Sequence, residues 1–264
     1  MASFHSRSNS FPSQTHPIMN DVGNHLDMLK ASLATSTFSI RADLAGLVDL
    51  HDGINSLIRM PLVQQALAHE QSENWMSELL EGSLRLVDLY GFSRDIVRLT
   101  KESVQDLESA IRRKADGIDS YGASRKKINK MINKCVKNIS NNSKRDSSTL
   151  PPVAKMLKEA ESLDLSILKY VLVLLSGEKG KSNHIHWSLL SKRARTAVVG
   201  QETCPEDLCY LNIHKSRKSI DSKKILKHLK ASETSVQEIE EGLEVLFRSL
   251  VKTRVSLLNA LSSH

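Results

Sequence analysis

The clearest hint of chemistry follows a long apolar run, where the tripeptide Gly180-Lys181-Ser182 appears. A phosphate-binding loop needs a further glycine five positions before the glycine of this tripeptide, so that backbone amides can surround the phosphates. That position is Leu175. A helix that ends at Gly177 and continues into a polar loop explains the same residues. A nucleotide-binding or hydrolytic enzyme that uses this degenerate loop therefore stays as the alternative hypothesis.

Other residue types that perform chemistry are scattered along the chain. His51 and Asp52 could orient an imidazole or bind a metal, but they stand alone in a helical pattern, which indicates polar surface residues. A zinc site needs four converging ligands. Residues of the types that bind zinc occur at Cys204, Cys209, His214, His184 and His186. The two cysteines are not followed by a second pair of ligands at the spacing of a zinc site. The sequence therefore predicts no catalytic residue, no metal site, no cofactor and no enzyme.

Positive charge is concentrated between Tyr121 and Arg145, where no acid interrupts the basic residues until Asp146. The predicted basic surface comprises Arg125, Lys126, Lys127, Lys130, Lys134 and Lys137. Apolar residues at helical spacing form the opposite face: Ile128, Met131, Ile132, Cys135, Val136 and Ile139. Such a helix can lie on anionic lipid or enter a calmodulin-like groove. The alternative is that the apolar face packs inside the protein and the lysines are only solvated.

A second basic run extends from His214 to Lys230. Neither run has interleaved aromatic residues on which bases could stack, so the sequence predicts no specific nucleic-acid partner. The net charge of +7 is consistent with an acidic protein or lipid partner.

The first 17 residues are serine-rich and contain no acid, which predicts a disordered tail over residues 1–17. Within it Arg7 lies three residues before Ser10, and Pro12 lies two residues after. This spacing resembles the phosphoserine motif that 14-3-3 proteins bind, since a phosphate on Ser10 would suit an arginine cluster. An ordinary serine-rich tail is the alternative. The same composition weakly resembles a plastid transit peptide, so a chloroplast location is a second option.

Three cysteines, thinly spread, do not resemble a disulfide framework and indicate a reducing compartment. No stretch reaches the eighteen or so apolar residues that cross a bilayer. The best candidate, Ile167 to Ser176, is too short and predicts a buried helix. We therefore expect a cytoplasmic protein, with peripheral membrane contact as an option.

Apolar residues recur every three or four positions through most of the chain, which indicates helices. The predicted helices cover Ile18 to Phe38, Ile40 to Ile58, Leu62 to Lys114 with a break near Ser72, the basic segment, Val153 to Ser176, and the C-terminal region. Residues 177–222 contain most of the remaining glycines and prolines and form an irregular segment. The sequence predicts one all-α domain over residues 18–264, an elongated bundle of long antiparallel helices with coiled-coil-like packing.

Two heptad rows run through the C-terminal region: Val236, Leu243, Leu250 and Leu257, and Ile239, Leu246, Thr253 and Ala260. Four further apolar residues widen the stripe beyond a two-stranded seam: Phe247, Val251, Val255 and Leu258. This width favours a helix in the bundle core, while a coiled coil that seeks a partner is the alternative.

Three segments carry a family resemblance: "FHSRSNSFPSQTHP" at the start, "ILKYVLVLLSG" with Trp187 beyond it, and "EEGLEVLFRSLVKTRVSLLNALS" at the end. Together they resemble the plant-specific BYPASS-related family, a plant domain of unknown function. The resemblance implies a predominantly helical plant protein that is connected with root and shoot development and has no assigned enzymatic reaction. We therefore expect a non-enzymatic scaffold or regulator that acts through protein contacts and through an anionic membrane surface.

Overall fold

The computed structural model describes residues 16–34, 39–69, 74–141, 150–177, 208, 211–212 and 222–262. These residues form seven long or medium helices: α1 (Pro17–Ala34), α2 (Ile40–Ile58), α3 (Pro61–His69), α4 (Asn74–Arg112), α5 (Ile118–Asn141), α6 (Pro152–Ser176) and α9 (Ser222–Ser262). No strand occurs within these ranges. The all-α prediction is confirmed, including the break between α3 and α4.

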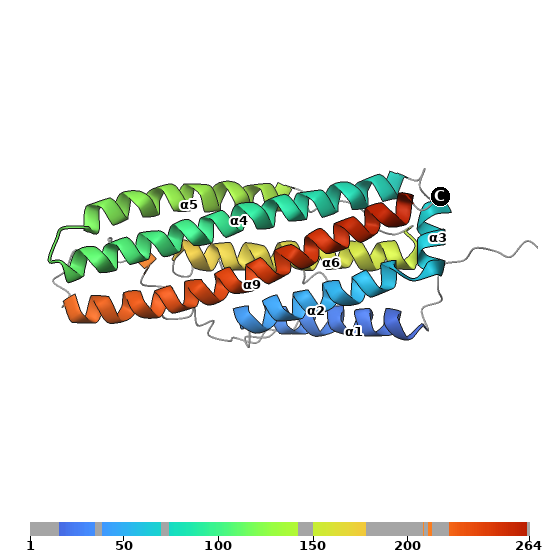
Figure 1. Cartoon of the computed structure of the whole chain (residues 1–264), viewed down its shortest axis with the longest axis horizontal. Helices are drawn as coiled ribbons and strands as arrows, with labels where there is room; N and C mark the ends of the chain where they lie inside the picture. The colour runs from blue at the N-terminus through green and yellow to red at the C-terminus, as the bar shows by residue number, and fades with distance from the viewer. Residues whose placement is uncertain are drawn as a thin grey trace, which may run out of the picture.

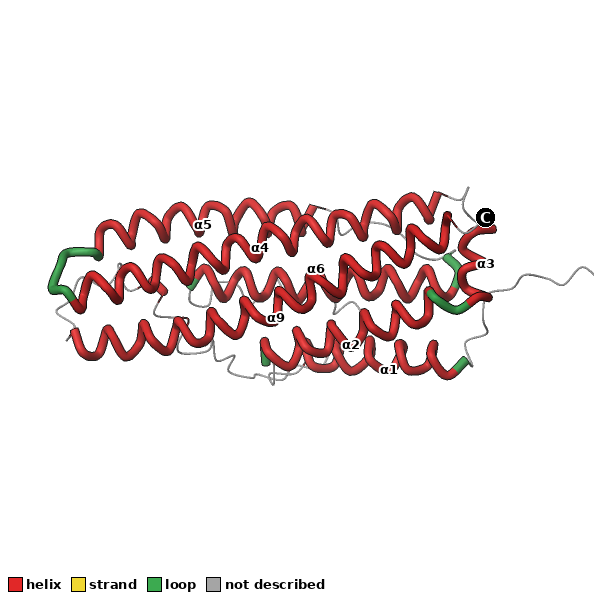
Figure 2. Tube along the Cα trace, in the orientation of Figure 1, coloured by secondary structure: helices red, strands yellow, loops and turns green. Residues whose placement is uncertain are grey.

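The helices form an elongated bundle, with α3 lying across one end (Figures 1 and 2). The long helices α4 and α9 lie side by side and run in opposite directions, and α5 returns along α4. The two helices α2 and α9 instead run in the same direction, since Arg41 lies near Glu238 and Asp52 lies near Lys252. The predicted antiparallel arrangement holds for the long helices α4 and α9, and the bundle also contains a parallel pair, α2 and α9.

Capping residues explain several helix ends. The Ser39 side chain accepts a hydrogen bond from the amide of Ala42, and the carboxylate of Asp43 accepts one from the amide of Ser39. Proline occupies the first position of α3 and of α6, where its missing amide proton costs nothing. Gly177 ends α6 with φ of 63°, a left-handed conformation that glycine adopts without strain, as the sequence predicts.

Both heptad rows of α9 are buried, as predicted, and the apolar run of α6 is buried as well. The four residues that were expected to widen the α9 stripe behave differently. Val251, Val255 and Leu258 are exposed, so their prediction as core residues is wrong. Phe247 is half-buried beneath the guanidinium of Arg94, 4.5 Å from the ring centre. The core stripe of α9 is therefore narrower than its apolar composition indicates.

The irregular segment contributes a small described part to the bundle. Leu208 and Leu211 are fully buried, and Leu211 and Asn212 form a short 3₁₀ turn. Among the residues that the structure describes, no helix is both long enough and apolar enough to span a bilayer.

Candidate functional site

Helix α5 presents a row of lysines to the solvent. We call Lys126, Lys127, Lys130, Lys134 and Lys137 the lysine face, and all five are exposed. The opposite side of the helix packs into the bundle through Ile128, Ile132, Cys135 and Ile139, which are buried against α4 and α6. The alternative in which the apolar face packs inside the protein is therefore the one that the structure adopts.

No carboxylate neutralises the lysine face within the described part of the chain. Asp119 in the first turn is the only acid on α5, and none of the five lysines lies within 4 Å of a carboxylate oxygen there. Some lysines on other helices do have such partners. Lys101 lies 2.7 Å from Glu240, and Lys158 lies 2.8 Å from Glu78.

Lys169 of α6 extends this positive region at the C-terminal end of α5. Its ammonium group donates a hydrogen bond of 3.2 Å to the hydroxyl of Ser140, and no carboxylate pairs with it in the described ranges. Partial burial lowers the pKa of Lys169, because desolvation disfavours its charged form. The lysine face and Lys169 together place six cations along one side of the bundle.

Arg125 does not belong to the exposed surface, and its assignment to the basic surface is wrong. Its side chain is fully buried, and its guanidinium donates 2.5 Å to the carbonyl oxygen of Leu175. Longer contacts of 3.5 and 3.4 Å reach Thr100 and Asn129. Burial lowers the pKa of Arg125, because desolvation disfavours its charged form.

Arg125 instead caps the C-terminal end of α6. The carbonyl of Leu175 is one of the last carbonyls of this helix, which lack partners within the helix and attract positive charge. Close by, Asn212 donates to the carbonyl of Ser176, and Tyr121 donates 2.8 Å to the carbonyl of Leu211. Burial raises the pKa of Tyr121 to about 12. Together these contacts fix the short turn at residues 211–212 against α5 and α6.

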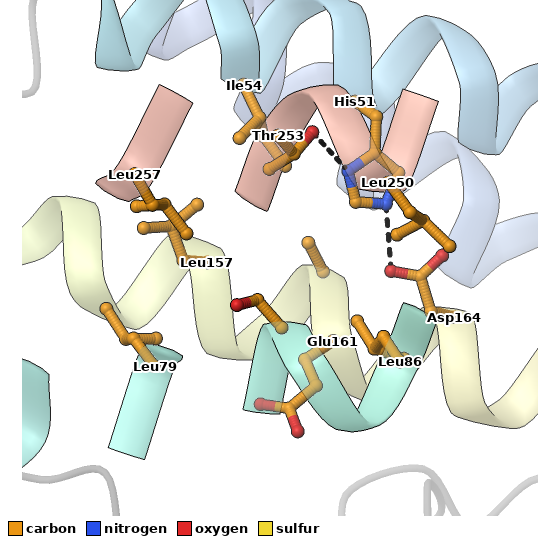
Figure 3. A pocket seen from close by; sticks show the side chains of 12 residues that line it. His51, Ile54, Leu79, Leu86, Leu157, Glu161, Asp164, Leu250, Thr253 and Leu257 are labelled. Atoms are coloured by element: carbon orange, nitrogen blue, oxygen red, sulfur yellow. Dashed lines mark hydrogen bonds and ion pairs between the residues drawn. The ribbon is translucent and has the colours of Figure 1, made fainter. Parts of the chain in front are cut away.

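A buried polar cluster lies between α2, α4, α6 and α9 (Figure 3). The Nε2 atom of His51 lies 2.9 Å from Oδ2 of Asp164, and its Nδ1 atom lies 3.3 Å from Oγ1 of Thr253. Tyr90 donates to the backbone carbonyl of Asp164, and Asn55 donates to Thr253. The expectation that His51 is a surface residue is wrong, whereas Asp52 lies outside the cluster, 3.2 Å from Lys252.

This cluster surrounds a cavity of about 40 Å³, which is large enough for a few water molecules and too small for a nucleotide. Both ring nitrogens of His51 already have partners, so neither is left to act as a base on a substrate. The Glu161 side chain points away from His51 in Figure 3 and pairs with Arg85. The arrangement therefore joins four helices by hydrogen bonds at the centre of the bundle.

A sequence signal for this cluster exists. His51 lies in line with Leu47, Leu44 and Ile58 on the buried side of α2, and Asp164 lies between the buried Leu163 and Leu165 of α6. A polar residue on a buried row needs a partner. The identity of the partner was not readable, because the two residues are 113 positions apart.

Several predicted residues lie outside the described residues. They are the tail motif Arg7, Ser10 and Pro12, the loop residues Lys181 and Ser182, and the ligand types Cys204, Cys209, His214, His184 and His186. Within the ranges that are described, no three histidine, cysteine or acidic side chains come together as metal ligands.

Comparisons with known proteins identify the family. Neither the curated proteins nor the solved structures contain a significant match to this chain. A family model described as Protein BPS1 matches residues 43–260, which includes all of α4, α5 and α6 and most of α2 and α9. The match agrees with the resemblance to BYPASS-related proteins, and it supports a role as a plant developmental regulator. The chain belongs to the BPS1 family.

Proposed function

We propose that this protein is a non-enzymatic helical scaffold that attaches to anionic membrane surfaces through the lysine face and presents the rest of the bundle to protein partners in root and shoot development. One observation carries the proposal: the five exposed lysines of α5 have no carboxylate partner in the described ranges, whereas Lys30, Lys101, Lys158 and Lys252 do. A cluster of lysines without counter-charges is what an anionic surface attracts.

The proposed membrane contact is by charge alone. The apolar side of α5 is buried against α4 and α6, so it cannot enter the acyl region of a bilayer or a calmodulin-like groove while the bundle is folded. Each lysine near an anionic membrane contributes about 1 kcal/mol, and salt screens this attraction within a Debye length of about 10 Å at 0.1 M ionic strength. Binding should therefore be reversible and should fall with salt, at the cytoplasmic face of a membrane.

Vesicle co-sedimentation tests this proposal, with phosphatidylserine-containing vesicles compared with pure phosphatidylcholine vesicles. The test variant changes Lys126, Lys130, Lys134 and Lys137 to Gln. The matched control changes the paired Lys30, Lys101, Lys158 and Lys252 to Gln and so removes the same net charge. We expect the test variant to bind anionic vesicles roughly a thousand-fold more weakly, since four contributions of about 1 kcal/mol are lost.

The control variant should keep most of the wild-type affinity, because its lysines already face carboxylates. Equal binding to both kinds of vesicle would disprove the proposal. So would an equal loss of affinity in the two variants, because net charge rather than the lysine face would then explain binding.

For protein partners, we extend the proposal to the N-terminal motif. The spacing of Arg7, Ser10 and Pro12 supports docking of a 14-3-3-type protein to phosphorylated Ser10. A peptide of residues 4–17 that is phosphorylated on Ser10 should bind a 14-3-3 protein in fluorescence anisotropy. The same peptide phosphorylated on Ser8 instead is the control, and equal binding of the two peptides would refute the motif.

A further inference from the structure

Ser140 lies in the last turn of α5, immediately beyond the lysine face. Its side chain is exposed, and its hydroxyl donates 3.0 Å to the carbonyl oxygen of Val136. The helix ends one residue later, at Asn141. Carbonyl groups in a last turn have no partners within the helix, so this turn opens at the cost of few hydrogen bonds. Entry of Ser140 into an enzyme that requires an extended peptide therefore costs these few hydrogen bonds and the packing of the neighbouring Ile139, which is buried.

The residues before Ser140 suit a basic-directed protein kinase. Lys137 lies three positions before it and Lys134 six positions before it, and no acid lies between them. All three side chains are exposed, so a kinase that recognises a cation three residues before serine meets both determinants on the surface. Part of the lysine face thus has the spacing that a basic-directed kinase requires before a serine.

Lys169 is an independent reason to expect a phosphate at this position. Its ammonium group lies 3.2 Å from the Ser140 hydroxyl, is partly buried, and has no acidic partner among the described residues. A neutral hydroxyl stabilises a partly desolvated cation less than an anion does. A phosphate on Ser140 would supply the missing counter-charge and tie the end of α5 to α6.

We infer that Ser140 is a phosphorylation site whose phosphate pairs with Lys169 and releases the lysine face from anionic membranes. In this step the Ser140 oxygen attacks the γ-phosphorus of ATP. The new Oγ–P bond replaces the bond between the γ-phosphorus and the bridging oxygen, ADP leaves, and the hydroxyl proton passes to a carboxylate of the kinase. The release part of the inference rests on the proposed membrane contact, whereas the pairing with Lys169 does not.

The expected effect on membrane binding follows from charge. The lysine face and Lys169 carry six positive charges, and a phosphoserine adds nearly two negative charges at pH 7. Affinity for anionic vesicles should fall roughly 30-fold, since each charge near the membrane changes affinity about five-fold.

The first experiment treats the full chain with ATP, Mg²⁺ and a basic-directed kinase and maps the sites by mass spectrometry. Ser140 should be modified, and modification at this position should disappear in Ser140→Ala and weaken in Lys137→Gln. Absence of phosphate on Ser140 would overturn the inference.

The second experiment measures co-sedimentation of full chains that carry phosphoserine at a single encoded position, with phosphatidylserine-containing vesicles. Phosphoserine at 140 is compared with phosphoserine at 56. Ser56 is also an exposed helical serine that donates to the carbonyl four residues earlier, and it lies on α2, on the other side of the bundle from α5 (Figure 1). Only the phosphate at position 140 should release the protein, and equal release by both would overturn the inference.

The third experiment separates this inference from the proposed membrane contact. Phosphorus NMR follows the second ionisation of the phosphate at position 140 in solution, without vesicles. Lys169 should lower the pKa of this phosphate by about half a unit, and Lys169→Met should restore it. A shift without vesicle binding by the unmodified chain would refute the membrane contact and its release but keep the pair. No shift would refute the pair.

Discussion

The outer side of α5 and the contact between α4 and α9 use their charges in opposite ways. Between α4 and α9, Lys101 meets Glu240 at 2.7 Å and Arg94 meets Glu244. On the outer side of α5, the five residues of the lysine face meet no carboxylate in the described part of the chain. The cations between α4 and α9 pair with carboxylates of the neighbouring helix, whereas those of the lysine face are exposed to solvent.

This difference indicates which charges support the fold. Pairs between helices favour one lengthwise register, because a shift of α9 along α4 would separate several pairs at once. The lysine face contributes nothing of this kind, and its closely spaced like charges repel each other slightly. Arg125 adds a third case, a buried cation that holds a helix end through a carbonyl group.

The largest expected effect on stability comes from Arg125. In Arg125→Ala the carbonyl of Leu175 loses its donor and a large buried side chain leaves a cavity, which together should lower the free energy of unfolding by about 3 kcal/mol. Urea denaturation followed by circular dichroism measures this change. Lys126→Ala, one residue along the chain and exposed, should change it by less than about 0.5 kcal/mol. Equal effects of the two variants would show that Arg125 is not a structural cation.

The second largest effect is expected when the two sets of four lysines are compared by the free energy of unfolding of their variants. Changing the paired Lys30, Lys101, Lys158 and Lys252 to Gln should lower the free energy of unfolding by about 2 kcal/mol, since each pair contributes roughly 0.5 kcal/mol. Changing Lys126, Lys130, Lys134 and Lys137 to Gln should leave it unchanged or raise it slightly. A destabilised second variant would mean that the lysine face supports the fold.

Much of the architecture was readable from the sequence because helical periodicity reflects burial on one side. The pattern located α2 at Ile40 to Ile58, with the bounds that the structure has, and it located the α6 end at Gly177. Proline at position 61 marked the start of α3 for a local reason, since its ring disfavours the preceding helical residue. These features depend on neighbours within a few residues.

Which side chains are buried and which are exposed is harder to predict from the sequence. Arg125 lies on the same row of α5 as Tyr121, Ile128 and Ile132, so its burial could have been inferred from spacing. Because Arg125 also belongs to a run of basic residues, the sequence favoured an exposed side chain over the burial that its spacing indicates. Val251 shows the opposite error, because an apolar residue beside a heptad row needs a neighbouring helix to cover it, and no sequence pattern says where that helix lies.

Tyr121, which contacts the turn at residues 211–212, should have a smaller and pH-dependent effect on the free energy of unfolding. Its pKa rises from 10.0 in the unfolded chain to about 12 in the fold, mainly by desolvation. Its contribution to stability is therefore fully present below pH 10 and is lost as the pH rises through about 12. Wild type should lose about 1.4 kcal/mol more than Tyr121→Phe between roughly pH 9 and pH 11, one pKa unit's worth. Equal losses in urea denaturation at the two pH values would contradict the buried hydroxyl.

The smallest expected effect is the coupling energy between two individual side chains, measured for one pair from each of the two regions. A double-mutant cycle on Lys101→Gln and Glu240→Gln isolates the coupling between the two side chains, which are about one quarter exposed. We expect a favourable coupling of about 0.5 kcal/mol, since solvent screens a pair at this depth.

The same cycle on Lys130→Gln and Lys134→Gln should give a coupling of similar size and opposite sign, because like charges four residues apart on a helix repel. Both cycles should weaken as salt is added, since screening acts on attraction and repulsion alike. Two favourable couplings would contradict the difference between the two regions, because the cations of the lysine face would then stabilise the fold as those between α4 and α9 do.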